Sequence, residues 1–169
     1  MTLLVLGLDP GTAVTGYGVV EWSPGRPGRL LECGVVKTPP RAALADRLCT
    51  IHEGVVDLIE SHHPDVIAVE SAFYAKNVRT TVTLSHARGV ILLAVAQAGI
   101  ELAEFPPAVV KKTVVGTGRA TKKQIAYMVQ QLLRLRRPPS PSDAADGIAL
   151  ALTYLIAGVG RRAKMAVSR

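Results

Sequence analysis

The stretch "TLLVLGLDPG", residues 2–11, is an almost continuous apolar run that ends in an aspartate and a Pro-Gly pair. Such a run is typical of a central strand that is buried on both faces and closes in a turn. The segment "VIAVE", residues 66–70, repeats the pattern and ends in Glu70. If the two strands are parallel neighbours, Asp9 and Glu70 meet at the carboxyl edge of the sheet, where ligand sites of α/β proteins collect.

The segments around this run predict an α/β domain. Residues 15–22 and 29–38 are rich in β-branched side chains and are parted by a Gly/Pro-rich stretch, which favours antiparallel hairpins. The other expected elements are a strand at 100–105 and helices at 42–62, 79–97, 107–115, 121–135 and 142–157. This order indicates a mixed sheet covered by helices in one domain over residues 1–158, followed by a basic tail at 159–169.

The composition favours a polyanionic partner. The chain has 169 residues, 49% of them hydrophobic, which is enough for one domain with a sizeable core. Lys and Arg number 20 against 13 acids, a net charge of +7, and the excess lies in short runs such as "GRATKK" and "RLRR". Solvated faces are the alternative explanation of such runs. No apolar run reaches about 18 residues and the start lacks signal-peptide features, so we expect a cytoplasmic protein without a membrane partner.

A second pair of acids lies in the apolar helix near the end of the chain. Asp143 and Asp146 are three residues apart and share a face of that helix. Ser140 as N-cap and Pro141 as first helical residue would give Asp143 a capping role, which is the alternative to a functional one. Neither aspartate has a basic residue four positions away, and two carboxylates about 5 Å apart repel by roughly 3 kcal/mol at an effective dielectric near 20. We therefore expect a counter-cation.

The four acids together favour a divalent metal site. Oxygen ligands with no nearby Cys or His indicate Mg²⁺ or Mn²⁺ rather than zinc. Two such ions about 3.5 to 4 Å apart can activate a water and stabilise the leaving oxygen of a phosphodiester. The predicted metal ligands are Asp9, Glu70, Asp143 and Asp146.

These motifs resemble the RuvC family of bacterial Holliday-junction resolvases. The matching segments occur in the family's order and spacing, and they are "GLDPGTAVTGYGVV", "VIAVESAFYAKN", "ARGV", "VKKTVVGTGRATKKQ" and "SDAADGIALALTYL". The resemblance implies a ribonuclease H-like fold, with a five-stranded mixed sheet and helices on both faces. It also implies a homodimeric endonuclease that resolves four-way DNA junctions by paired symmetric nicks in recombination and repair, together with the RuvA and RuvB proteins.

The resemblance implies roles for individual residues. It implies two metal ions per subunit on the four carboxylates, with Lys111 and Lys122 as catalytic lysines. Phe73 matches the family's residue that stacks on bases at the opened junction centre. The other expected DNA contacts are Tyr74, whose alternative is core packing, Lys76, Arg79, Lys112, Arg119 and Lys123. Gly147 stands where alanine is expected, and it should loosen its helix by about 1 kcal/mol.

Several points stay open at this level. "DPGT" before a glycine-rich strand also resembles the phosphate loop of actin-like kinases and RuvX-like proteins, although such kinases normally need two related domains. A non-catalytic DNA-binding protein would explain the charge, but not four unpaired acids. The helix at 79–97 is apolar on nearly all sides, which favours a subunit interface. Within it, Arg88 is a candidate for pairing with an acid inside the fold.

Overall fold

Strand β1 (Leu3–Asp9) lies at the centre of a five-stranded sheet of order β3-β2-β1-β4-β5. The computed structural model describes residues 2–71 and 78–158. The other strands are β2 (Val14–Trp22), β3 (Arg29–Lys37), β4 (Val66–Glu70) and β5 (Glu101–Phe105). β1, β2 and β3 pair antiparallel, whereas β4 runs parallel to both β1 and β5. The predicted mixed sheet and its hairpins are confirmed.

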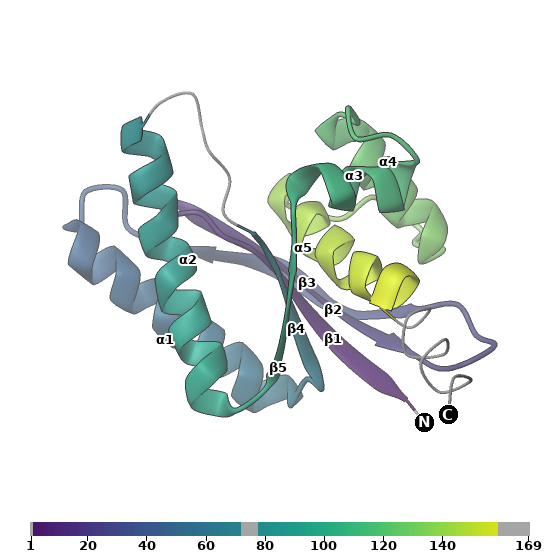
Figure 1. The fold of residues 1–169 in the computed structure, drawn as a ribbon, viewed down its shortest axis with the longest axis horizontal. Helices are drawn as coiled ribbons and strands as arrows, with labels where there is room; N and C mark the ends of the chain where they lie inside the picture. The colour runs from purple at the N-terminus through teal and green to yellow at the C-terminus, as the bar shows by residue number, and fades with distance from the viewer. Residues whose placement is uncertain (1, 72–77, 159–169) are drawn as a thin grey trace.

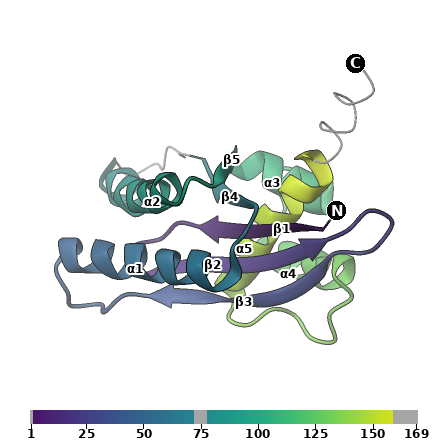
Figure 2. The same cartoon turned by 90° about the horizontal axis from the view of Figure 1, so that it is seen from below.

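The helices cover both faces of this sheet, as Figures 1 and 2 show. The helices are α1 (Leu44–His62), α2 (Val78–Ala98), α3 (Pro107–Val115), α4 (Lys122–Leu132) and α5 (Ser142–Thr153), and a π-helical turn, Tyr154–Gly158, follows α5. One apolar core lies between the sheet and α1 and α2, and a second lies between the sheet and the last three helices. The sheet is therefore the middle layer of three.

The alternation of side chains along β1 and β4 decides which helical layer the last side chain of each strand faces. Leu8 and Val69 pack into the core beneath α1 and α2, whereas Val5 and Ala68 pack into the core beneath α5. Because neighbouring side chains of a strand point to opposite faces, Asp9 and Glu70 are directed to the α3–α5 layer.

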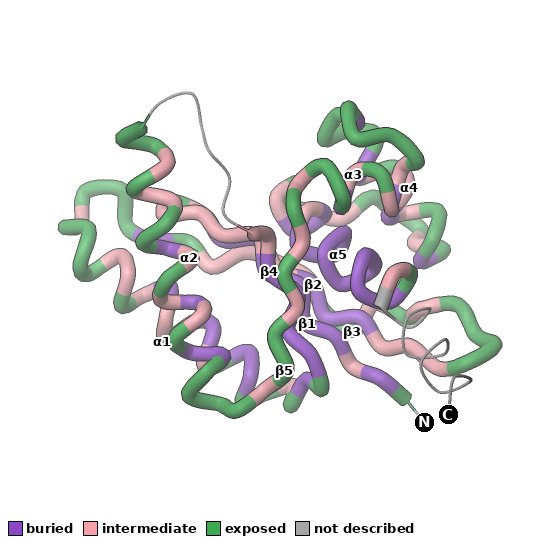
Figure 3. The backbone as a smooth tube through the Cα atoms, in the orientation of Figure 1, coloured by how far each residue is buried: buried purple, intermediate pink, exposed green. Residues whose placement is uncertain are grey.

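Helix α5 lies unusually close to the sheet because glycines form the contact. A Cβ on Gly7 would overlap the carbonyl oxygen of Gly147, and a Cβ on Gly16 would overlap that of Asp143. A Cβ on Gly147 would in turn clash with the backbone of Tyr17. Figure 3 shows α5 buried along most of its length. Gly147, which lowers the helix propensity of α5, therefore allows the helix to pack closely on the sheet. Helix propensity alone did not predict this role.

Replacing Gly16 with Ala should destabilise the protein by about 1 to 3 kcal/mol, the usual cost of overpacking a tight contact. The added methyl group would push the first turn of α5, with Asp143 on it, away from β2. Urea unfolding measures the change. Gly118→Ala is a matched control, because its Cβ would make only ordinary contacts; equal stability of the two variants would contradict the prediction.

Helix α5 begins at Ser142, as the sequence predicted. Its N-cap is Pro141, with no side-chain cap hydrogen bond, so the alternative in which Ser140 caps the helix does not hold. The proline ring holds φ near −68°, and with ψ at 169° the residue is extended, which makes Ser142 the first helical residue. Asp143 is thus not the acid of a capping box. By contrast, Thr121 and Gln124 form a capping box at the start of α4.

Helix α2 buries one face and exposes an apolar one. Ala87 and Ile91 are fully buried, whereas Val82 and Leu93 are about half exposed. By length and composition α2 could cross a membrane, which the search for apolar runs in the sequence did not predict. Its buried face packs against α1 and the sheet, as in the core helix of a layered domain.

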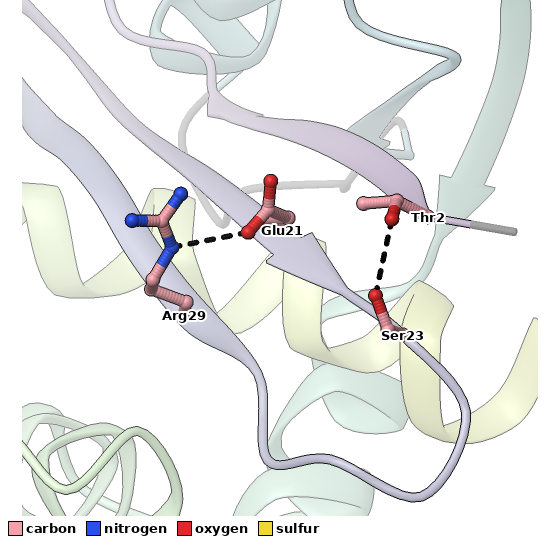
Figure 4. A network of polar contacts seen from close by, with 4 residues as sticks. All are labelled: Thr2, Glu21, Ser23 and Arg29. Carbon is pink, nitrogen blue, oxygen red and sulfur yellow. Dashed lines mark hydrogen bonds and ion pairs between the residues drawn. The ribbon is translucent and has the colours of Figure 1, made fainter.

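Two sets of polar contacts hold the margins of the sheet. Arg88 of α2 pairs with Glu104 of β5, which confirms the expectation that this arginine pairs with an acid. At the opposite end of the sheet from Asp9, Arg29 pairs with Glu21 at 3.0 Å, and the hydroxyls of Thr2 and Ser23 lie 3.2 Å apart (Figure 4). The contact between Arg88 and Glu104 lies beside β4, the strand that carries Glu70. The contacts of Arg29 and Thr2 are remote from it.

Candidate active site

The ends of two parallel strands and the start of α5 bring the predicted carboxylates together. Asp9 is the last residue of β1 and Glu70 the last of β4, and the register pairs the preceding residues, Leu8 and Val69. Asp146 projects from α5, which packs on β1 and β2. Asp9, Glu70 and Asp146 line one cavity of about 290 Å³. The predicted convergence of these three acids is therefore seen in the structure.

Two lysines complete the cavity. Lys111 of α3 and Lys122, the first residue of α4, line it beside the acids. The Lys122 ammonium donates a hydrogen bond to Asp146, with Nζ 2.9 Å from Oδ2, and another to Asp143, with Nζ 3.3 Å from Oδ1. The expectation that Asp143 and Asp146 lack a basic partner is wrong, because α4 supplies one from more than twenty residues away in the sequence.

Asp9 and Glu70 lie where ionisation of their carboxyl groups is disfavoured. Burial, and then the carboxylates of Glu70 and Asp146, raise the pKa of Asp9 from 3.8 to about 8. Burial and the Asp146 carboxylate also raise the pKa of Glu70, while Lys111 and Lys122 act in the opposite direction. The hydrogen bond to Asp146 holds the pKa of Lys122 above its usual range. The cavity therefore concentrates negative charge that the protein neutralises only in part.

The donor set fits a divalent cation that prefers oxygen. All the acidic groups are carboxylates, and a dication beside Asp9 would relieve the penalty that raises its pKa. Among residues 2–71 and 78–158, no three acidic, His or Cys side chains form a ready metal cage. Lys122 already occupies one oxygen of Asp143 and one of Asp146. Metal binding through these same two oxygens would require the ammonium to move.

The remaining predicted DNA contacts that the structure describes do not line this cavity. Lys112 on α3, Arg119 between α3 and α4, and Lys123 on α4 are all exposed. Lys112 and Lys123 are the next residues in the chain after Lys111 and Lys122. Arg79 is exposed in the first turn of α2 and lines a different cavity, of about 250 Å³, with Thr12. The other three predicted contacts, Phe73, Tyr74 and Lys76, lie outside the described residues.

The cavity also has an apolar wall that the motifs did not indicate. Pro107, Val110 and Ile125 line it opposite the carboxylates. Helical spacing is the signal that could have identified one of them, because Ile125 follows Lys122 by three residues and so shares its face of α4.

Comparison with known proteins identifies the family. The family model described as crossover junction endodeoxyribonuclease RuvC matches residues 5–154. The RuvC of Pelotomaculum thermopropionicum is 45% identical over 152 residues, which cover 90% of this chain and 92% of that protein. The RuvC of Halorhodospira halophila is 47% identical over 150 residues, covering 89% of this chain and 88% of that protein.

Solved structures agree with this assignment. Thermus thermophilus RuvC in complex with a Holliday junction substrate superposes with a TM-score of 0.85 at 34% identity, covering 92% of this chain and 94% of that chain. A yeast mitochondrial Holliday junction resolvase, at 13% identity and a TM-score of 0.62, supports the fold alone. With the family model matched over nearly the whole domain, this chain belongs to the RuvC family of crossover junction endodeoxyribonucleases.

Proposed function

We propose that this protein is a Mg²⁺-dependent endonuclease that resolves four-way DNA junctions in recombination and repair. The observation that carries the proposal is the single cavity in which Asp9, Glu70 and Asp146 meet Lys111 and Lys122. In this proposal the enzyme makes two nicks at symmetric positions of the junction and leaves 5′-phosphate and 3′-hydroxyl ends. Neither the phosphate-loop kinase nor the non-catalytic DNA-binding protein is favoured, because the family match extends over residues 5–154.

The carboxylates and the lysines divide the chemistry between them. Two Mg²⁺ ions per subunit, with Mn²⁺ as an alternative, held by Asp9, Glu70, Asp143 and Asp146, would activate a water and stabilise the leaving oxygen. Lys111 and Lys122 face the same cavity from α3 and α4, where their ammonium groups can bind the non-bridging oxygens of the scissile phosphate. The apolar wall around Ile125 excludes water on that side and strengthens these interactions.

Duplex arms of the junction are expected to lie over the exposed cations next to the cavity. Lys112, Arg119 and Lys123 are positioned to contact the backbone, where phosphate contacts supply most of the affinity. Phe73 is proposed to stack on bases at the junction centre, with Tyr74, Lys76 and Arg79 as neighbouring contacts. The RuvA and RuvB proteins are proposed partners, and the cytoplasm is the proposed location.

Nuclease assays on a four-way junction and on linear duplex of the same sequence test this function. With Mg²⁺ we expect paired nicks in the junction only, and with chelator we expect binding without cleavage. Cleavage of linear duplex at the same rate would exclude a junction-selective enzyme. Junction binding with no cleavage in either Mg²⁺ or Mn²⁺ would favour the non-catalytic alternative.

A homodimer is proposed because a junction with two-fold symmetry needs two active sites. The exposed apolar stripe on α2, formed by Val82, Gly89 and Leu93, is the proposed interface, since these residues follow one another at helical spacing on the outer face.

Replacing Leu93 with Glu should convert the protein to a monomer. Leu93 is 51% exposed, so the change leaves the core intact but would bury a charge in the interface. Sedimentation should show the monomer, and junction binding should fall about tenfold or more because one subunit contacts only half of the substrate. Leu44→Glu, at an exposed leucine of α1, is the matched control. A folded Leu93→Glu protein that stays dimeric would place the interface elsewhere.

A further inference from the structure

Lys122 holds the two aspartates of α5 together from outside that helix. Its Nζ atom is 2.9 Å from an oxygen of Asp146 and 3.3 Å from an oxygen of Asp143. The lysine side chain is 69% exposed, whereas that of Asp146 is 17% exposed. Lys122 can therefore leave the aspartates for solvent without any repacking of the core, but Asp146 cannot follow it.

The oxygens that accept these hydrogen bonds belong to predicted metal ligands. Asp146 lines the cavity together with Asp9 and Glu70, the other two carboxylates that would hold a divalent ion there. An ammonium group and a divalent cation repel each other at such distances, and one carboxylate oxygen cannot serve both fully. Binding of Lys122 to the aspartates therefore disfavours binding of metal to them, and metal binding disfavours the contact with Lys122.

We propose that Lys122 competes with the divalent ions for Asp143 and Asp146, and that metal binding releases its ammonium to the substrate phosphate. This inference rests on the proposed function, because it assumes that Asp146 is a metal ligand. Lys122 then has two positions: on the carboxylates of the metal-free protein, where it offsets their repulsion, and on the phosphate of the loaded complex.

The competition has a consequence for the order of binding. Because the ammonium must be displaced, Lys122 weakens metal binding when no DNA is present. A phosphate that accepts the displaced ammonium removes part of that cost, so metal and junction each strengthen the binding of the other. Without DNA the protein would then bind metal weakly, and its metal sites would fill completely only when the junction is bound.

Isothermal titration of the DNA-free protein with Mn²⁺ tests the competition. Lys122→Met keeps the length of the side chain and removes its charge, and it should bind Mn²⁺ roughly three- to tenfold more tightly than the wild type. Lys123→Met is the matched control, because Lys123 is the next residue, is also exposed and has no bond to the aspartates. The control should change Mn²⁺ affinity by less than about twofold, since exposed charges are screened.

Two further variants make the outcome decisive. Lys122→Arg keeps a cation that binds carboxylates at least as well, so its Mn²⁺ affinity should be no tighter than wild type. Asp146→Asn tests the underlying metal site and should weaken Mn²⁺ binding. If Asp146→Asn binds Mn²⁺ as the wild type does, the proposed metal site fails. If it binds weakly but Lys122→Met is no tighter than wild type, or no tighter than Lys123→Met, the site stands and the competition is overturned.

Discussion

Replacing Asp9 with Asn, Glu70 with Gln or Asp146 with Asn is expected to lower the rate of junction cleavage roughly a thousandfold or more, as the loss of an essential catalytic group does in other enzymes. Each change removes a carboxylate from the cavity but leaves Lys111, Lys112 and Lys123 in place. Since phosphate contacts by cations supply most of the affinity, junction binding in chelator should stay within about threefold of wild type.

Single-turnover cleavage with saturating Mg²⁺, together with junction binding in chelator, measures both halves of this prediction. Asp57→Asn is a suitable control, because Asp57 is an exposed acid of α1 away from the cavity, and its loss should leave cleavage unchanged. Near wild-type cleavage by any of the three variants would remove that residue from the site. Asp143→Asn should have a smaller effect, because Asp143 does not line the cavity and its side chain is 40% exposed.

Asp9 is also expected to make the metal-free protein less stable as the pH rises. Its pKa is about 8 in the folded protein and 3.8 without the fold, so the folded state binds the proton more tightly than the unfolded chain does. The contribution of protonated Asp9 to the free energy of unfolding is fully present below about pH 4 and is lost as the pH rises through about 8. Urea unfolding in chelator should therefore show a falling free energy of unfolding from about pH 5 to pH 9.

The Asp9→Asn variant should lack most of this decline. One pKa unit corresponds to about 1.36 kcal/mol, and the rise from 3.8 to about 8 sets an upper limit of roughly 6 kcal/mol. Asp9 is only partly buried, so a gain of about 2 to 3 kcal/mol over wild type at about pH 9 is the expected result. Near pH 4 the two proteins should be similarly stable.

Asp146→Asn provides the contrast for this measurement. It also removes a negative charge from the cavity, but it breaks the ion pair with Lys122, so its gain at high pH should be clearly smaller than that of Asp9→Asn. Mg²⁺ should stabilise the wild type more than either variant, because a ligand that binds only the native state stabilises it by RT ln(1 + [L]/Kd), which is larger for tighter binding. Parallel slopes for wild type and Asp9→Asn in chelator would show that Asp9 is ionised in the folded state.

Local patterns were sufficient for the order of the elements and for two of the acids. The apolar run before Asp9 and its repeat before Glu70 predicted two buried strands that end together, because burial on both faces of a sheet leaves few positions for polar residues. The Gly/Pro-rich stretch between the second and third strands likewise predicted a hairpin. The alternative that did not hold was Ser140 as the N-cap of α5, because Ser140 and Pro141 can each fill more than one position at a helix start.

Hydrophobic periodicity and the placement of acids are local properties of the chain, and they predict the fold class, the residue types of the site and the strand ends that carry Asp9 and Glu70. Three contacts could be found only in the folded protein: Lys122 lies on Asp143 and Asp146, Arg88 reaches Glu104, and Gly147 packs on Tyr17. Each of these contacts joins residues far apart in the chain, and its partner is selected by how α2, α4 and α5 pack on the sheet. The raised pKa of Asp9 also depends on tertiary packing, because it results from burial and then from the carboxylates of Glu70 and Asp146.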